Sequence, residues 1–240
     1  LAQPSIPPNP RLGLRKLYGV APAATVAAGV SGLAMGAFWG LGPVYAGQLG
    51  FDRDGVSHFM VATIVGGALL QWPLGRLSDR LDRRIGLALA CAVAAGVALL
   101  AMPAAGWGSG WIFGLYFAFG GLAFSIYPMS VAHMLDTLPR EDLLSGCSSL
   151  LLVHGIGAML GPMIAGELMS RHGPGALPAY FAAVLAALAL FLVARLALNR
   201  RPDRNPAAFH PMLRTTPAAL ELLPETQTEA DLASSNKETH

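Results

Sequence analysis

Residues 66–84, GGALLQWPLGRLSDRLDRR, begin inside an apolar run and end with four arginines and two aspartates in nine residues. This concentration of charge stands out, because only 12% of the 240 residues are charged and 54% are hydrophobic. A soluble domain carries about 25% charged residues. The chain has too few charges to cover a solvated surface, so its composition predicts an integral membrane protein.

Six apolar runs are long enough to cross a bilayer, because a spanning helix needs about 20 mostly apolar residues. They cover approximately residues 20–46, 56–76, 85–105, 111–135, 146–170 and 177–198. We expect the Pro-rich segment 1–19 to be a cytoplasmic linker and the polar segment 199–240 to be a disordered cytoplasmic tail. The expected fold is an all-α membrane protein with a six-span bundle over residues 20–198.

Lysines and arginines are divided unevenly between the two ends of these spans. One end receives only Arg53 and Arg171. The other receives eleven, namely Arg11, Arg15, Lys16, Arg76, Arg80, Arg83, Arg84, Arg140, Arg200, Arg201 and Arg204. Because cytoplasmic loops retain positive charge, both termini and the arginine-rich stretch are expected in the cytoplasm.

Spans two and five share a pattern that indicates an internal duplication. Residues 67–80 and 157–171 both contain Gly-Ala-apolar-Leu, then a proline, then Gly-x-Leu-x-x-Arg. Spans one and four share GLAM at 32–35 and GLAF at 121–124, each followed by a later proline. A duplicated unit of three spans must insert its second copy in the opposite sense. The six helices are therefore expected as a 3+3 inverted repeat, which is typical of secondary transporters.

His154 is the only readily ionisable side chain near the middle of a predicted span. Ionisable groups in a bilayer are functional candidates by default, and histidine titrates near neutral pH. Two interpretations stay open: His154 couples a proton or contacts a solute, or it is a neutral, hydrogen-bonded structural residue. Glu167, near the end of its span, is either proton-linked or simply solvated.

Other classes of function have less support. The net charge of +2 does not suggest a nucleic-acid partner, and Cys91 and Cys147 have no metal or redox spacing. Gly108-Ser109-Gly110 falls short of an intramembrane serine protease motif, and no histidine lies in the last span. The single Asn-Pro-Ala, at 205–207, does not make the pair that a water channel needs. A membrane scaffold without transport activity remains an alternative.

The stretch 75–84, GRLSDRLDRR, resembles the loop signature of the major facilitator superfamily (MFS), Gly-x-Leu-Ala-Asp-Arg-x-Gly-Arg-Lys. Ser78 stands where the signature has Ala, and Asp82 where it has Gly, which puts the turn geometry in doubt. The six-span layout extends the resemblance over about residues 17–200. The runs GAFWGLGPVYA and QWPLGRLSDR look most like a bacterial branch of the family called YcaD-like.

The resemblance implies a gate at the cytoplasmic mouth, formed by the residues at the signature positions. These are Gly75, Leu77, Asp79, Arg80, Arg83 and Arg84. In the family the acidic residue, here Asp79, helps to latch two halves together, partly by facing a helix N-terminus of the opposite half. For the arginines, a role in topology alone is an equally good explanation.

The first and fourth helices of each half line the substrate cavity in this family. This nominates side chains suited to an amphipathic or apolar solute: Ser31, Phe38, Trp39, Phe117, Phe124, Ser125 and Tyr127. Tyr45 also lies on the first span, nearer the outer interface. For any single aromatic residue, core packing or an interfacial belt is the alternative. Gly161 and Pro162 resemble the family's Gly-Pro-rich helix, where they either bend the helix or allow tight packing.

Members of the family normally have twelve spans, so these six are expected to form one half. The Pro-rich entry and the long polar exit favour the C-terminal half, with the N-terminal six-helix half as its partner. The expected function is secondary active transport of a small solute by alternating access, not enzymatic catalysis, with H⁺ as a candidate coupling ion. No cofactor or metal is expected, and the lipid environment would be the bacterial inner membrane.

Overall fold

The computed structural model describes residues 13–80, 82–104 and 106–198, and within these ranges the side chains of Asp79 and Arg140 are not described. The predicted linker is described only from residue 13, and the predicted tail 199–240 lies outside the described residues. The elements are α1 (Leu14–Val20), α2 (Pro22–Gln48), α3 (Arg53–Arg80), α4 (Arg83–Ala104), α5 (Ser109–Leu135), a short 3-10 helix η1 (Arg140–Asp142), α6 (Leu143–His172) and α7 (Ala176–Leu198). All the regular elements of the described residues are helical, which confirms the all-α prediction.

The six long helices α2–α7 are each apolar and long enough to cross a membrane. They lie over the six predicted spans, and five of them begin or end a few residues beyond the apolar run. The reason is that polar flanking residues continue the helix: α3, for example, starts at Arg53 and runs to Arg80. The first half of the arginine-rich motif is therefore helical, and the connection to α4 is shorter than the sequence suggested.

The segment assigned as a linker contributes one short helix that packs on the bundle. Leu17 of α1 is completely buried, and it lies in a small apolar cluster with Ala24, Met134 and Leu150. Burial of Leu17 against the bundle stabilises α1. The sequence did not indicate this helix, because prolines and charged residues surround Leu17.

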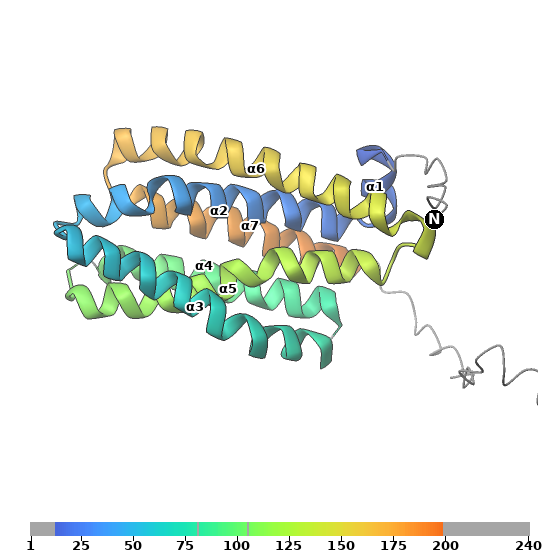
Figure 1. Cartoon of the computed structure of the whole chain (residues 1–240), viewed down its shortest axis with the longest axis horizontal. Helices are drawn as coiled ribbons and strands as arrows, with labels where there is room; N and C mark the ends of the chain where they lie inside the picture. Colours follow the sequence, from blue (N-terminus) through green and yellow to red (C-terminus); the bar gives the residue numbers. More distant parts are fainter. Residues whose placement is uncertain (1–12, 81, 105, 199–240) are drawn as a thin grey trace, which may run out of the picture. The chain divides into compact units, whose positions relative to one another are not determined.

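The long helices form two layers (Figure 1). In the front layer α6 lies beside α2, and α3 and α5 cross one another on the other side of α2; α7 and α4 lie behind this layer. The closest packed pairs are α2 with α6, α3 with α5, and α4 with α7. Exchanging α2 with α5, α3 with α6 and α4 with α7 reproduces the same three pairs. This is the pairing that two copies of a three-helix unit would produce.

The two copies run in opposite directions. In Figure 1, α2 starts at the end where α1 lies and runs away from it, whereas α5 runs toward that end. The matched prolines lie inside corresponding helices, with Pro43 in α2 and Pro128 in α5, and Pro73 in α3 and Pro162 in α6. The arrangement therefore agrees with a 3+3 inverted repeat.

The layer between front and back is packed with alanines and aromatic rings. One face of α4 buries Cys91, Ala94 and Ala98 in this layer. Nearer the α2–α3 connection, Phe59 and Tyr116 have ring centroids 4.5 Å apart. These contacts leave α3 and α6 as the least buried of the six long helices.

Candidate functional site

Four side chains from three helices form an aromatic strip in the front layer: Trp39 on α2, Phe124 and Tyr127 on α5, and His154 on α6. The Trp39 and Phe124 ring centroids lie 6.2 Å apart, and those of Tyr127 and His154 lie 4.5 Å apart. Phe124 and Tyr127 are three residues apart, so they share one face of α5. Trp39 is 51% exposed and the other three are half-buried, so the strip is accessible from outside the bundle.

His154 is held by a hydrogen bond to the neighbouring helix. Its Nδ1 lies 3.2 Å from the backbone carbonyl oxygen of Ala28 on α2. A carbonyl oxygen only accepts hydrogen bonds, so Nδ1 must carry the hydrogen. In the neutral ring, Nε2 is then left as an acceptor that can take a hydrogen bond or a proton. Both sequence interpretations of His154 are compatible with this geometry.

Three of the nominated cavity residues are buried and are not part of the accessible strip. Ser31, Phe38 and Ser125 are buried, and the Ser125 hydroxyl donates to the carbonyl oxygen of Leu122, 2.7 Å away in its own helix. The Ser31 hydroxyl has no hydrogen-bond partner among the described residues. Phe38 nevertheless supports the strip, because its ring centroid lies 5.8 Å from that of Phe124.

The two remaining aromatic candidates have packing contacts. Phe117 is half-buried, and its backbone lies so close to Gly66 of α3 that a side chain there would overlap it. Tyr45 is buried beside Phe59, with ring centroids 6.0 Å apart. Neither ring stacks on a ring of the strip, so their assignment to a cavity stays a prediction.

Glycines bring the helices of the front layer into backbone contact. A Cβ on Gly32 or Gly36 of α2 would overlap the backbone of α6, and one on Gly157 or Gly161 would overlap the backbone of α2. Pro162 follows Gly161, and its ring lies 3.2 Å from where a Cβ on Gly40 would stand. α6 continues through Pro162 as one helix, so tight packing is the role these contacts support directly.

The candidate gate lies at the connection between α3 and α4. Gly75, Leu77 and Arg80 are in the last turns of α3, and Arg83 and Arg84 open α4. The side chain of Asp79 lies outside the described part of the structure. In place of the signature glycine, Asp82 forms a turn in which its Oδ1 accepts a hydrogen bond from the Arg84 backbone N–H, 2.9 Å away.

One partner of the gate was missed from the sequence. The Arg83 Nε lies 2.6 Å from Oδ2 of Asp136, the residue just after the end of α5. The ion pair joins the start of α4 to the end of α5, across more than fifty residues of chain. The only signal in the sequence was the position of Asp136 directly after a predicted span. An acidic residue at such a position does not by itself indicate an ion pair.

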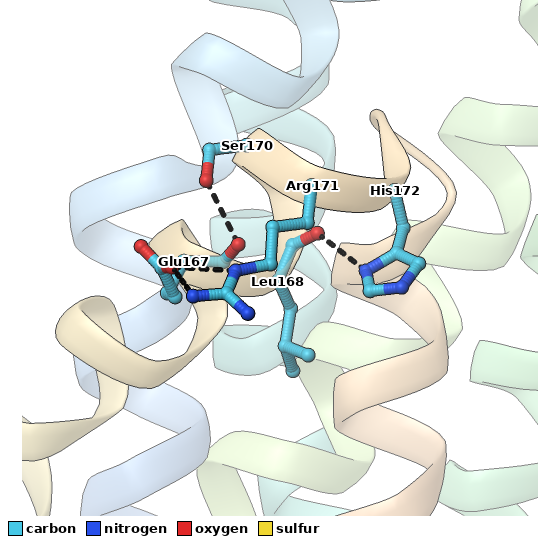
Figure 2. A network of polar contacts seen from close by, with 5 residues as sticks. All are labelled: Glu167, Leu168, Ser170, Arg171 and His172. Atoms are coloured by element: carbon cyan, nitrogen blue, oxygen red, sulfur yellow. Dashed lines mark hydrogen bonds and ion pairs between the residues drawn. The ribbon is translucent and has the colours of Figure 1, made fainter.

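Glu167 belongs to a separate network at the far end of α6, shown in Figure 2. Its Oε1 lies 2.6 Å from Nε and 2.5 Å from Nη2 of Arg171, one turn further along the helix. Ser170 donates to the Glu167 carbonyl oxygen, 2.8 Å away. Both charged side chains are more than half exposed, so the pair resembles a solvated helix end.

The described residues contain no group of three His, Cys, Asp or Glu side chains that could hold a metal ion. Cys91 and Cys147 are both free cysteines. The arrangement instead offers an apolar aromatic face with one imidazole, and charged pairs at the helix ends.

Comparisons with known proteins agree with this arrangement. The family model of the Major Facilitator Superfamily matches residues 24–227. The chain is 26% identical over 181 residues to an uncharacterized MFS-type transporter, YcaD, of Escherichia fergusonii, which covers 75% of this chain and 44% of the relative. An uncharacterized MFS-type transporter of Enterobacter sp. strain 638 is 29% identical over 60% of this chain and 36% of the relative.

The chain thus spans less than half the length of the curated relatives it matches. No solved structure matches it. Because the family match extends over more than half of the residues, the chain belongs to the Major Facilitator Superfamily, and its relatives place it with the YcaD-like branch.

Proposed function

We propose that this chain forms one six-helix half of a secondary transporter that moves a small amphipathic solute by alternating access. The observation that carries the proposal is the aromatic strip of Trp39, Phe124, Tyr127 and His154, which is accessible on the front layer. Aromatic rings provide apolar contact area, and one imidazole provides directional hydrogen bonding. A solute with an apolar body and one hydrogen-bond donor matches this combination.

The exposure of the flanking helices supports a second half as the partner. Met159 and Met163 of α6 are 63% and 67% exposed, and Leu69 of α3 is 62% exposed. Three of the four strip residues lie on α2 and α5, which pack against α6 and α3 respectively. A second six-helix unit facing the front layer would enclose the strip and form the opposite wall of a pathway. We assign this chain to the C-terminal half, with both termini on the cytoplasmic side of an inner membrane.

The remaining roles follow from the same proposal. Asp79, Arg80 and Arg84 would form the cytoplasmic gate between halves, while Arg83 is held within this half by Asp136. His154 would be the proton-coupling or solute-contacting group, because its Nε2 can accept a hydrogen bond or a proton. Glu167 is the weaker candidate for proton coupling, because Arg171 already pairs with it. The process involves no covalent chemistry on the solute, in keeping with a transporter family.

A flux measurement tests the proposal. Cells that produce this chain together with an N-terminal half of a YcaD-like relative are screened for altered accumulation of fluorescent amphipathic solutes. Tyr127→Ala and His154→Gln should abolish the altered accumulation of any solute found, at unchanged protein levels in the membrane. His58→Gln is the matched control, because His58 is an exposed histidine near the start of α3.

Equal accumulation with and without the chain, across a broad panel, would favour the membrane-scaffold alternative. Solvent access to the strip provides a second measurement that needs no substrate. In a background with both native cysteines replaced by serine, Trp39→Cys should react with a membrane-impermeant thiol reagent, and Val193→Cys on α7 should not. Equal protection of both cysteines would contradict an aqueous pathway along the strip.

A further inference from the structure

An apolar cleft lies where α3, α4 and α5 meet, away from the aromatic strip. Its volume is about 170 Å³, and its large lining side chains are Leu74, Leu77, Leu89, Val93, Leu122 and Met129. Leu77, Leu89 and Val93 are each almost half exposed, so the cleft opens toward the outside of the bundle. All of these residues belong to helices that are candidate membrane spans. The cleft therefore opens toward the hydrocarbon of the bilayer.

Two arginines belong to the chain segments next to one end of this cleft. Ser78 and Gly86 line it where α3 and α4 join, and a Cβ on Gly86 would stand 3.0 Å from the Ser78 hydroxyl oxygen. Arg80 follows two residues after Ser78 and is exposed, and Arg84 precedes Gly86 by two residues and is half-buried. Two guanidinium groups are thus carried by the two chain segments that close the apolar cleft.

A third arginine marks the depth of this region in the membrane. The Arg76 guanidinium carbon lies 4.0 Å from the centre of the Trp72 ring, and Trp72 is 65% exposed. Tryptophan and arginine side chains gather at the level of lipid headgroups. The cleft and its basic end therefore extend from the hydrocarbon to the headgroup layer on the side of the α3–α4 connection.

We propose that this cleft binds an anionic phospholipid, with part of one acyl chain between α3 and α4 and the phosphate at Arg80 and Arg84. An apolar cavity of about 150 Å³ can hold a benzene molecule, so this one is large enough for a segment of an acyl chain. Guanidinium groups bind phosphate through paired hydrogen bonds. Basic pockets at the ends of spanning helices favour anionic over zwitterionic headgroups. The apolar cleft thus suits the acyl chain, and the two arginines suit the phosphate.

The cleft requires no solute and no second half, so the lipid site can exist whether or not the chain transports. The test uses the full chain, reconstituted in nanodiscs that contain equal amounts of phosphatidylglycerol and phosphatidylcholine. Native mass spectrometry after release from the disc counts the lipids that stay bound. We expect one retained phosphatidylglycerol per chain, in preference to phosphatidylcholine.

Two variants separate the two parts of the site. Val93→Trp fills the cleft and should remove the retained lipid, whereas Val193→Trp adds the same ring to an exposed position on α7 and should not. Arg80→Gln with Arg84→Gln should weaken phosphatidylglycerol binding roughly thirtyfold. Arg15→Gln with Lys16→Gln removes the same charge from α1 and should have little effect.

The proposal is overturned if phosphatidylcholine is retained as well as phosphatidylglycerol by the unmodified chain. It is also overturned if the filled cleft of Val93→Trp retains the lipid, or if the α1 double variant loses as much as the arginine pair. The wild-type lipid preference needs no variant, so the proposal remains testable even where a substitution prevents folding.

Discussion

Gly157→Ala should separate α6 from α2, although it adds a single methyl group. A Cβ at Gly157 would overlap the carbonyl oxygen of Gly29 and would lie 2.9 Å from the backbone nitrogen of Leu33. Ordinary Cβ contacts are 3.4 Å or longer. The obstacle is the backbone of the facing helix, which cannot rotate away as a flexible side chain can. The two helices must therefore move apart along their shared interface.

The size of the effect follows from two opposing contributions. Overpacking a closely packed site costs about 1–3 kcal/mol. Replacing glycine by alanine inside a helix stabilises the folded state by about 0.5–1 kcal/mol. Because backbone atoms cannot give way, we expect a net loss of about 1–2 kcal/mol in the free energy of unfolding. For a chain of this size, that corresponds to a fall in Tm of roughly 2–8 °C.

Gly155→Ala is the matched control, two residues earlier in the same helix. A Cβ at Gly155 meets nothing within 4 Å, so only the helix-propensity gain applies. The assay is the thermal loss of monodisperse protein in detergent, measured by fluorescence-detected size-exclusion chromatography. Gly157→Ala should melt below the wild type, and Gly155→Ala at or above it. Equal melting of the two variants would refute the close backbone contact between α2 and α6.

Three further predictions concern polar groups. Tyr116 is buried, and its hydroxyl lacks a hydrogen bond of good geometry among the described residues. Tyr116→Phe should therefore leave Tm unchanged or raise it. A large fall in Tm would show that the hydroxyl has a hydrogen-bond partner. Arg83→Gln and Asp136→Asn should each cost about 0.2–1 kcal/mol, because both side chains are partly exposed, and a double-mutant cycle should show that the costs are not additive. Glu167→Gln should cost only about 0.3–0.5 kcal/mol through loss of its pair with Arg171, a difference that 1 M salt should erase in the same thermal assay.

The sequence predicted the number and position of the long helices because hydropathy and length are summed over about twenty residues. Single polar residues at the ends shift a boundary without changing such a sum. The inverted repeat was also predictable, because the matched glycines sit at helix contacts. Gly67 faces Phe124, and Gly121 faces Leu70, within the α3–α5 pair. Short motifs were enough to predict the repeat, because these matched glycines lie where two helices pack closely.

The orientation of each helix about its own axis was not predictable. In a soluble protein, polar residues mark the outward face, but lipid-facing residues are as apolar as buried ones. Phe38 and Trp39 are adjacent aromatics that the sequence treated alike, yet Phe38 is buried and Trp39 is 51% exposed. The ion pair between Arg83 and Asp136 was equally hidden, because it depends on which helix ends meet. Both properties are set by packing between helices distant in the sequence.

The repeat also explains why the two ends of the bundle differ in charge. Gly75-Arg76-Leu77-Ser78-Asp79-Arg80 ends α3, and the matching Gly166-Glu167-Leu168-Met169-Ser170-Arg171 lies near the end of α6, at the opposite end of the bundle (Figure 1). Ser78 and Met169 occupy the same place in the two copies, and both are buried, so the packing position is kept. Among the exposed positions, Arg80 recurs as Arg171, whereas Arg76 does not recur.

Arg76 in the first copy corresponds to Glu167 in the second, where the glutamate pairs with Arg171. An inverted copy carries its helix end to the other face of the membrane, where unpaired positive charge would oppose the expected topology. Replacing one arginine by a glutamate within one helical turn of the other cancels that charge without altering the buried face. An inverted repeat in a membrane can therefore preserve its glycines, prolines and buried contacts, whereas the net charge of its exposed helix end must change.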